Sequence, residues 1–127
     1  MVQCARGATT MKDWLPGTEQ QRFEIAVEKT QKSIAAVEEI GRTIRGKYLV
    51  WLQGESDGVG TGVGTKKSTY KTRFLQFWNA IKAELGFEKC FIIRVHRFRD
   101  GYSYNCYPII DAQEELALDN DDIELVT

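Results

Sequence analysis

The chain has 127 residues, which is long enough for one domain to bury a core without disulfides or a metal. Its hydrophobic content of 43% and charged content of 28% are those of folded globular proteins, and they exclude the disordered and fibrous classes. A net charge of -1 gives no long-range attraction for nucleic acid or for an anionic membrane surface, so neither is an expected partner.

Three cysteines, Cys4, Cys90 and Cys106, stand at wide spacings without a CxxC pair. This pattern predicts reduced thiols and no zinc or redox site, as is usual for a cytoplasmic protein. No apolar stretch approaches the roughly 20 residues that span a bilayer. A secreted parent protein is the alternative to a cytoplasmic one, because a signal peptide would lie upstream of Met1.

The first half of the chain predicts a strand end, a long helix and a second strand. The apolar run from Val2 to Ala5 stops at Arg6-Gly7, which is typical of a strand followed by a turn. A helix is expected between an N-cap at Thr18 and a stop at Gly46. Its inner face has residues at spacings of three and four: Phe23, Val27, Thr30, Ile34, Val37, Gly41 and Ile44. The continuous apolar run from Tyr48 to Leu52 predicts a strand covered on both faces.

The second half predicts two further helices and two further strands. Gly58 to Thr65 holds four glycines, which predicts a mobile loop. Helical spacing follows in two sets: Tyr70, Phe74, Phe77, Trp78, Ile81 and Leu85, then Ile109, Ala112 and Leu116. Gly86 is expected to end the first of these helices, and Pro108 to lie in the first turn of the second. Cys90 to Val95 and Ile123 to Val126 are predicted strands.

Strands that alternate with helices predict βαβ units in a three-layer αβα fold, an α/β domain with a parallel sheet and helices on both faces. Ligands of such sheets bind beyond the carboxyl ends of the strands. Gly7, the segment Gln53 to Asp57 and the loop His96 to Asp100 are therefore expected on one rim. The Gln53 to Asp57 segment is the richest in chemistry, because it presents a carboxamide, two carboxylates and a hydroxyl directly after a strand.

Trp51 to Asp57 is similar to the WxQGExD block of the sialate and carbohydrate O-acetylesterases of the SGNH hydrolase superfamily. Ala5 to Thr9, with Trp14 following, resembles the A-x-G-G-T...W block of that family, and Asp111 to Gln113 resembles its R-x-A-Q helix. These matches agree in order and spacing, so the resemblance covers essentially the whole chain. It implies a partial acetylesterase domain over residues 1–127, with a flavodoxin-like SGNH hydrolase fold that is incomplete at both ends.

The resemblance implies that the Gly7 N–H and the Gln53 side-chain amide are oxyanion-hole donors for hydrolysis of an acetyl ester on a carbohydrate. Glu55 and Asp57 are then expected to hold the loop and to orient Gln53. No cofactor and no metal are implied. The alternative reading of Gln53 to Asp57 is a polar turn that only satisfies its own backbone.

Departures from the family leave the assignment as an enzyme open. The nucleophilic serine would belong to a G-x-S-N block on a strand before Met1, and the histidine base to a D-x-x-H block after the strand that begins at Ile123. Neither block occurs in the sequence. Ala8 replaces the second glycine of the A-x-G-G-T block, which would hinder a positive φ there. A catalytically inactive remnant, acting as a glycan-binding or assembly module, is the alternative function, and unpaired sheet edges predict self-association.

Two other motifs are weaker. Gly54 to Gly58 spells the G-x-S-x-G nucleophile elbow around Ser56, with His96 and Asp100 as partners, but an elbow serine should lead straight into a helix. Gly58 to Ser68 resembles a phosphate-binding loop but has Thr65 where that motif needs lysine. His96 is interpreted as an edge residue or, alternatively, as a base poised near neutral pH. Trp14 is interpreted as a packing residue or, alternatively, as part of a sugar-sized pocket.

Overall fold

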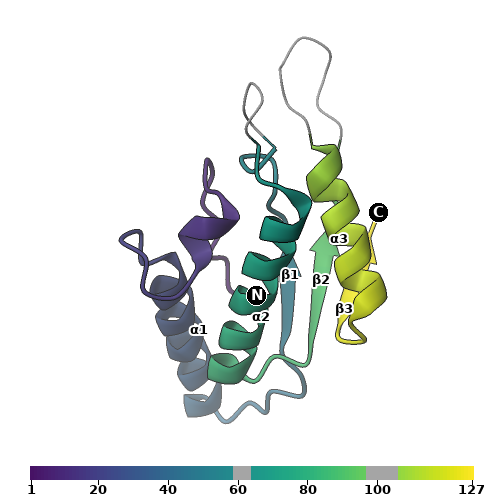
Figure 1. Ribbon diagram of the computed structural model, residues 1–127. Coiled ribbons are helices and arrows are strands. Elements are labelled where there is room, and N and C mark those ends of the chain that lie inside the picture. Colours follow the sequence, from purple (N-terminus) through teal and green to yellow (C-terminus); the bar gives the residue numbers. More distant parts are fainter. Residues whose placement is uncertain (59–63, 97–105) are drawn as a thin grey trace.

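The computed structural model describes residues 1–58, 64–96 and 106–127 (Figure 1). In chain order the elements are η1 (Met11–Trp14), α1 (Arg22–Glu39), β1 (Tyr48–Trp51), α2 (Lys67–Leu85), β2 (Lys89–Ile93), α3 (Tyr107–Asp119) and β3 (Ile123–Val126). The strands form one parallel sheet in the order β1-β2-β3, with Trp51 opposite Ile92 and Ile92 opposite Leu125. The α/β class and the parallel βαβ connections are confirmed, consistent with the three-layer class.

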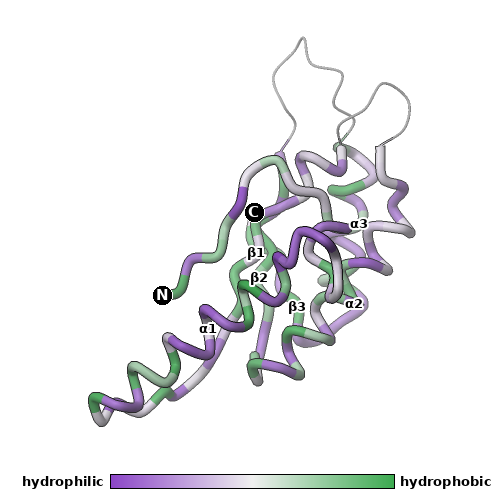
Figure 2. Tube along the Cα trace, turned by 90° about the vertical axis from the view of Figure 1, so that its left-hand side faces the viewer, coloured by the Kyte–Doolittle hydropathy of each residue, from purple (hydrophilic) through white to green (hydrophobic). Residues whose placement is uncertain are grey.

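Helices α2 and α3 lie side by side on one face of the sheet, and α1 packs against α2 on the side away from α3 (Figures 1 and 2). Buried residues of the strands point toward these helices: Trp51, Cys90, Ile92 and Ile123. An aromatic cluster joins β1, η1 and α2, with ring centroids 4.6 Å apart for Trp51 and Phe77 and 5.3 Å apart for Trp14 and Trp51. This covered face of the sheet is therefore the hydrophobic core.

The opposite face of the sheet is exposed, so the expectation that β1 is covered on both faces is wrong for this chain. Tyr48, Val50 and Leu52 are 55%, 62% and 58% exposed, and Ile93 and Val126 are also exposed. Successive side chains of a strand point to opposite faces, so covering one face leaves every second residue in solvent. The continuous apolar run predicted burial that no described helix provides.

Helix α1 begins later and ends earlier than the helix predicted between Thr18 and Gly46. Thr18 does not cap it, because Gln21 adopts a left-handed conformation (φ 49°) directly before the first helical turn. At the other end Gly41 has φ 72° and donates its N–H to the Glu38 carbonyl, while Arg42 donates to the Val37 carbonyl. These two bonds form a Schellman motif, which ends the helix before Ile44 and Gly46.

Residues 2–5 form no strand, in contrast to the sequence prediction. The strands β1, β2 and β3 pair only with one another, so residues 2–5 have no strand partner among the described residues. The Lys29 side chain donates to the Gln3 carbonyl and ties this segment to α1.

The boundaries of α2 and α3 agree with the sequence prediction. Gly86 ends α2 with φ 64°, and Pro108 lies in the first turn of α3.

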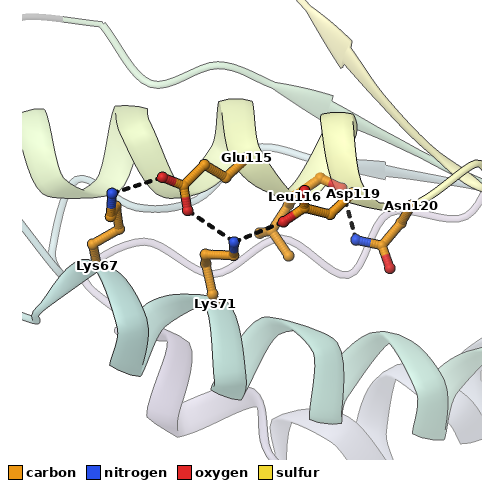
Figure 3. Close-up of polar contacts among 6 residues, drawn as sticks. All are labelled: Lys67, Lys71, Glu115, Leu116, Asp119 and Asn120. Carbon is orange, nitrogen blue, oxygen red and sulfur yellow. Dashed lines mark hydrogen bonds and ion pairs between the residues drawn. The ribbon is translucent and has the colours of Figure 1, made fainter.

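Charged side chains of α2 and α3 form ion pairs. The Glu115 carboxylate accepts from the ammonium groups of Lys67 (2.6 Å) and Lys71 (2.8 Å), and Lys71 also reaches Asp119 (Figure 3). These ion pairs bridge the two helices.

Candidate functional site

The candidate site begins where β1 ends, at the carboxyl edge of the sheet. Gln53 and Gly54 follow β1 directly, and Val95 follows β2. Gly54 has φ 144°, and a Cβ there would lie only 2.7 Å from Ile109 Cγ2 and 3.0 Å from Val95 Cγ1. Any side chain at this position would collide with Val95, which follows β2, and with Ile109 of α3, which explains why the motif has glycine.

The Gln53 side chain crosses from β1 to the N-terminal segment of the chain. It is 7% exposed, and its Nε2 donates to the Thr9 carbonyl at 3.0 Å and to Asp57 Oδ2 at 2.6 Å. Both acceptors lack hydrogens, so this orientation of the amide follows from the network. The segment that contains Gly7 is thereby brought to the Gln53 loop, two residues from the Thr9 contact.

Asp57 is the anchor of this arrangement. Its carboxylate is 1% exposed, and Oδ2 also accepts the Met11 N–H at 2.7 Å, while Oδ1 accepts the Thr65 hydroxyl at 2.9 Å. The Thr65 N–H in turn donates to the Asp57 carbonyl at 2.9 Å. One buried carboxylate therefore joins three segments by charge-assisted hydrogen bonds, as expected of a residue that orients Gln53.

Residues 6–14 are held in a fixed conformation beside this loop. The Trp14 indole donates to the Thr9 hydroxyl at 2.9 Å, and that hydroxyl donates to the Arg6 carbonyl at 3.0 Å. Ala8 adopts φ 57°, so the positive φ that the family's glycine would allow is present here in an alanine. Trp14 itself is 6% exposed and packs on Trp51, which supports the packing interpretation over a sugar pocket.

The Gly7 N–H and the Glu55 carboxylate differ from the Gln53 amide and the Asp57 carboxylate in their hydrogen bonding. Within residues 1–58, 64–96 and 106–127, neither group has a hydrogen-bond partner. Gly7 is an exposed residue. The structure thus gives Asp57 bonds that orient Gln53 and gives Glu55 none.

The nucleophile elbow does not fit the structure around Ser56. Residues 55–57 form a turn, closed by the Gly58 N–H on the Gly54 carbonyl at 3.0 Å, and α2 begins only at Lys67. His96 is exposed and lies three residues after the end of β2, whereas Asp100 lies outside the described residues. Residues 59–63 of the loop that was expected to be mobile, Gly58 to Thr65, also lie outside them. Ser56 therefore lacks the direct entry into a helix that an elbow requires.

Two residues of the site were not identified as such from the sequence. The Tyr70 hydroxyl lies 3.1 Å from the Gln53 carbonyl and 3.3 Å from Gln53 Oε1. Gln113 Nε2 donates to the same carbonyl at 2.9 Å, and the Gln113 Oε1 accepts the Val95 N–H at 2.9 Å. The R-x-A-Q resemblance was the only signal for Gln113, and Tyr70 was visible only as one member of a helical apolar period.

Burial favours the neutral forms of three side chains, Tyr70, Cys90 and Cys106. Burial raises the pKa of Tyr70 far above its ordinary value, so the hydroxyl remains a donor. Burial also raises the pKa of Cys90 to about 12 and, with a smaller contribution from the Glu55 charge, the pKa of Cys106. Protonated thiols are poor nucleophiles, so neither of these cysteines provides one.

The described residues offer neither a cluster of metal ligands nor a helix that could cross a membrane. Among residues 1–58, 64–96 and 106–127, no group of three or more His, Cys, Asp or Glu side chains could hold a metal ion. The helices in these same ranges all fall short of the length and hydropathy that a membrane crossing requires.

Comparisons with known proteins agree with this geometry. A protein from Arabidopsis thaliana with an X-ray structure at 1.6 Å resolution superposes with a TM-score of 0.68 at 22% sequence identity, over 97% of this chain and 45% of that chain. This chain therefore spans less than half of that protein's length. No curated protein matches the sequence. The family model described as carbohydrate esterase, sialic acid-specific acetylesterase, matches residues 1–126, so the chain belongs to that carbohydrate esterase family.

Proposed function

We propose that this chain provides the oxyanion-binding part of an enzyme that removes acetyl groups from a sialate-type carbohydrate. The donors would be the Gly7 N–H and the Gln53 carboxamide. One observation carries the proposal: the buried Gln53 side chain reaches across to the Thr9 carbonyl and so brings the Gly7 segment to the end of β1. Two distant segments with suitable donors thus meet at the edge where parallel sheets bind ligands.

The hydrogen bonds indicate how Gln53 would serve an oxyanion. Both Nε2 hydrogens are in use, one on Asp57 at 2.6 Å and the other on the Thr9 carbonyl at 3.0 Å. The bond to the carboxylate is the shorter and charge-assisted one, so it fixes the amide. The Nε2 hydrogen of Gln53 that points to the Thr9 carbonyl is the one that an oxyanion would share. Preorganised donors of this kind typically contribute about 3 to 4 kcal/mol each to stabilisation of the transition state.

The sequence includes no G-x-S-N nucleophile block and no D-x-x-H block, so we expect the 127-residue chain alone to lack turnover. The test is hydrolysis of an activated acetyl ester by the purified chain and by its Ser56→Ala variant. Both should match a buffer blank. Saturable turnover in the parent chain that disappears in Ser56→Ala would contradict the proposal and favour the elbow.

A second candidate function is a non-enzymatic assembly module. It is supported by the exposed apolar side chains of Tyr48, Val50 and Leu52 on the open face of the sheet. Contiguous apolar surface of this kind is typical of interaction sites. A module built for assembly should form a defined oligomer that survives dilution, which light scattering measures.

A further inference from the structure

We infer that Tyr70 and Gln113 are positioning residues that set the orientation of the Gln53 carboxamide. The inference rests on the proposed function for its purpose, because a carboxamide needs a fixed orientation only if it has a ligand to meet. The geometry that supports it concerns this chain alone. Both side chains are 0% exposed, yet both direct polar atoms at the same residue.

Gln113 connects the ends of β1 and β2. Its Nε2 donates to the Gln53 carbonyl at 2.9 Å and lies 3.3 Å from the Tyr70 hydroxyl, while its Oε1 accepts the Val95 N–H at 2.9 Å. Its polar atoms therefore face the ends of the two strands and the Tyr70 hydroxyl, although Gln113 lies on the buried apolar face of α3. A buried amide is costly unless it is satisfied in this way.

Tyr70 contacts Gln53 at both its backbone and its side chain. The hydroxyl hydrogen faces two acceptors of that residue, the carbonyl at 3.1 Å and Oε1 at 3.3 Å. Removing this hydroxyl would leave Oε1 without a donor in the described part of the chain. Tyr70 thus holds the oxygen end of the carboxamide, while Asp57 holds the nitrogen end.

The two ends together exclude the flipped amide. A half-turn of the Gln53 carboxamide would place Oε1 against the Thr9 carbonyl and the Asp57 carboxylate, which offer no hydrogen there, and Nε2 against the Tyr70 hydroxyl. Gln113 fixes the backbone from which the side chain starts. The nitrogen consequently points toward the segment that contains Gly7.

The experiment follows the Gln53 side-chain amide by NMR in the intact chain. In the parent protein its two hydrogens should exchange with solvent much more slowly than those of the exposed Gln76. In Tyr70→Phe and in Gln113→Met we expect exchange to be roughly tenfold faster and both resonances to move toward the positions of a free glutamine. Tyr48→Phe, which removes an exposed hydroxyl, and Gln76→Met are the matched controls and should leave the Gln53 signals unchanged.

Global stability is measured in parallel by urea unfolding. A purely structural role would lower stability while the Gln53 signals stay in place, and that result in either folded variant would overturn the inference. If one variant fails to fold, the other decides; if neither folds, the parent protein decides, because exchange at Gln53 as fast as at Gln76 contradicts the inference directly. None of these signals depends on hydrolysis, so failure of the proposed function would leave them unaltered.

Discussion

The rim and the open face of the sheet both depart from the usual rule that apolar side chains are buried and polar ones exposed, and they do so in opposite ways. At the rim, polar side chains are buried: Gln53, Asp57 and Gln113 are 7%, 1% and 0% exposed. On the open face apolar side chains are exposed, Val50 at 62% and Leu52 at 58%. The polar residues are satisfied within the chain, and the apolar ones are not. Buried polar groups with full hydrogen bonding are typical of preorganised sites, whereas exposed apolar surface is typical of interaction sites.

The largest expected effect is at the rim, in Asp57→Ala. The substitution leaves the Met11 N–H, Gln53 Nε2 and the Thr65 hydroxyl without their acceptor. We expect a loss of about 3 kcal/mol or more in the free energy of unfolding, because hydrogen bonds to charged groups contribute about 1.5 to 3 kcal/mol each. Urea unfolding measures it, with the exposed Asp121→Ala as control. A loss similar to that of the control would show that the network does not stabilise the fold.

Substitutions on the open face should change self-association of the chain instead of its folding stability. We expect the parent chain to self-associate through Val50, Leu52 and their neighbours, and the pair Val50→Lys and Leu52→Lys to weaken association by roughly tenfold or more, since each apolar side chain contributes about 1.5 to 3 kcal/mol when buried. Ile40→Lys, on an apolar residue 73% exposed at the end of α1, is the control. A parent chain that is monomeric by light scattering and melts cooperatively would contradict this prediction.

A smaller effect is expected at Ala8, where the site carries backbone strain. Ala8 has φ 57°, which costs a residue with a Cβ roughly 1 kcal/mol, so Ala8→Gly should raise the free energy of unfolding by about that amount. The same substitution at Ala36, an exposed position inside α1, should lower it by about 0.5 to 1 kcal/mol. Thermal melts of the two variants should therefore shift in opposite directions. Shifts of the same sign would contradict the strain at Ala8.

The smallest effect is expected from the ion pairs between α2 and α3. Hydrogen bonds from Lys67 and Lys71 lower the pKa of Glu115 from 4.5 to about 2. A lowered pKa in the folded state means that the contribution to stability is complete above pH 4.5 and is lost as the pH falls toward 2. Solvent screening keeps it small. Urea unfolding between pH 2 and 5 should show a shallower pH dependence in Glu115→Gln than in the exposed control Glu84→Gln; equal slopes would contradict it.

Local pattern predicted the elements of the molecule better than their limits. Periodicity located α2 and α3, and apolar runs located the three strands. Periodicity could not show that Gly41 would take a positive φ and end α1, because a glycine at a helical spacing can lie within a helix or end it. The covered and open faces of β1 could not be distinguished either, since burial depends on which helices lie against the strand.

The sequence predicted where the site lies, but it did not predict the hydrogen bonds that hold the site together. The motif and the parallel topology indicated that Gln53 and the Gly7 segment would meet, and the fold brings Thr9 against Gln53. The hydroxyl of Tyr70 and the amide of Gln113 could not be assigned, because each acts on Gln53 from more than fifteen residues away, at separations of 17 and 60. Only the tertiary structure shows that their polar atoms face inward.

The most direct test of the account is an NMR titration of the chain with acetate, whose anionic oxygen stands in for the oxyanion. If Gly7 and Gln53 form one donor site, the Gly7 backbone amide and the Gln53 side-chain amide should shift together along a single saturation curve, and Gln53→Glu should abolish the response at Gly7 because it replaces a donor by a negative charge. A shift at Gly7 that persists in Gln53→Glu, or a response of the two amides at different concentrations, would contradict the shared oxyanion site.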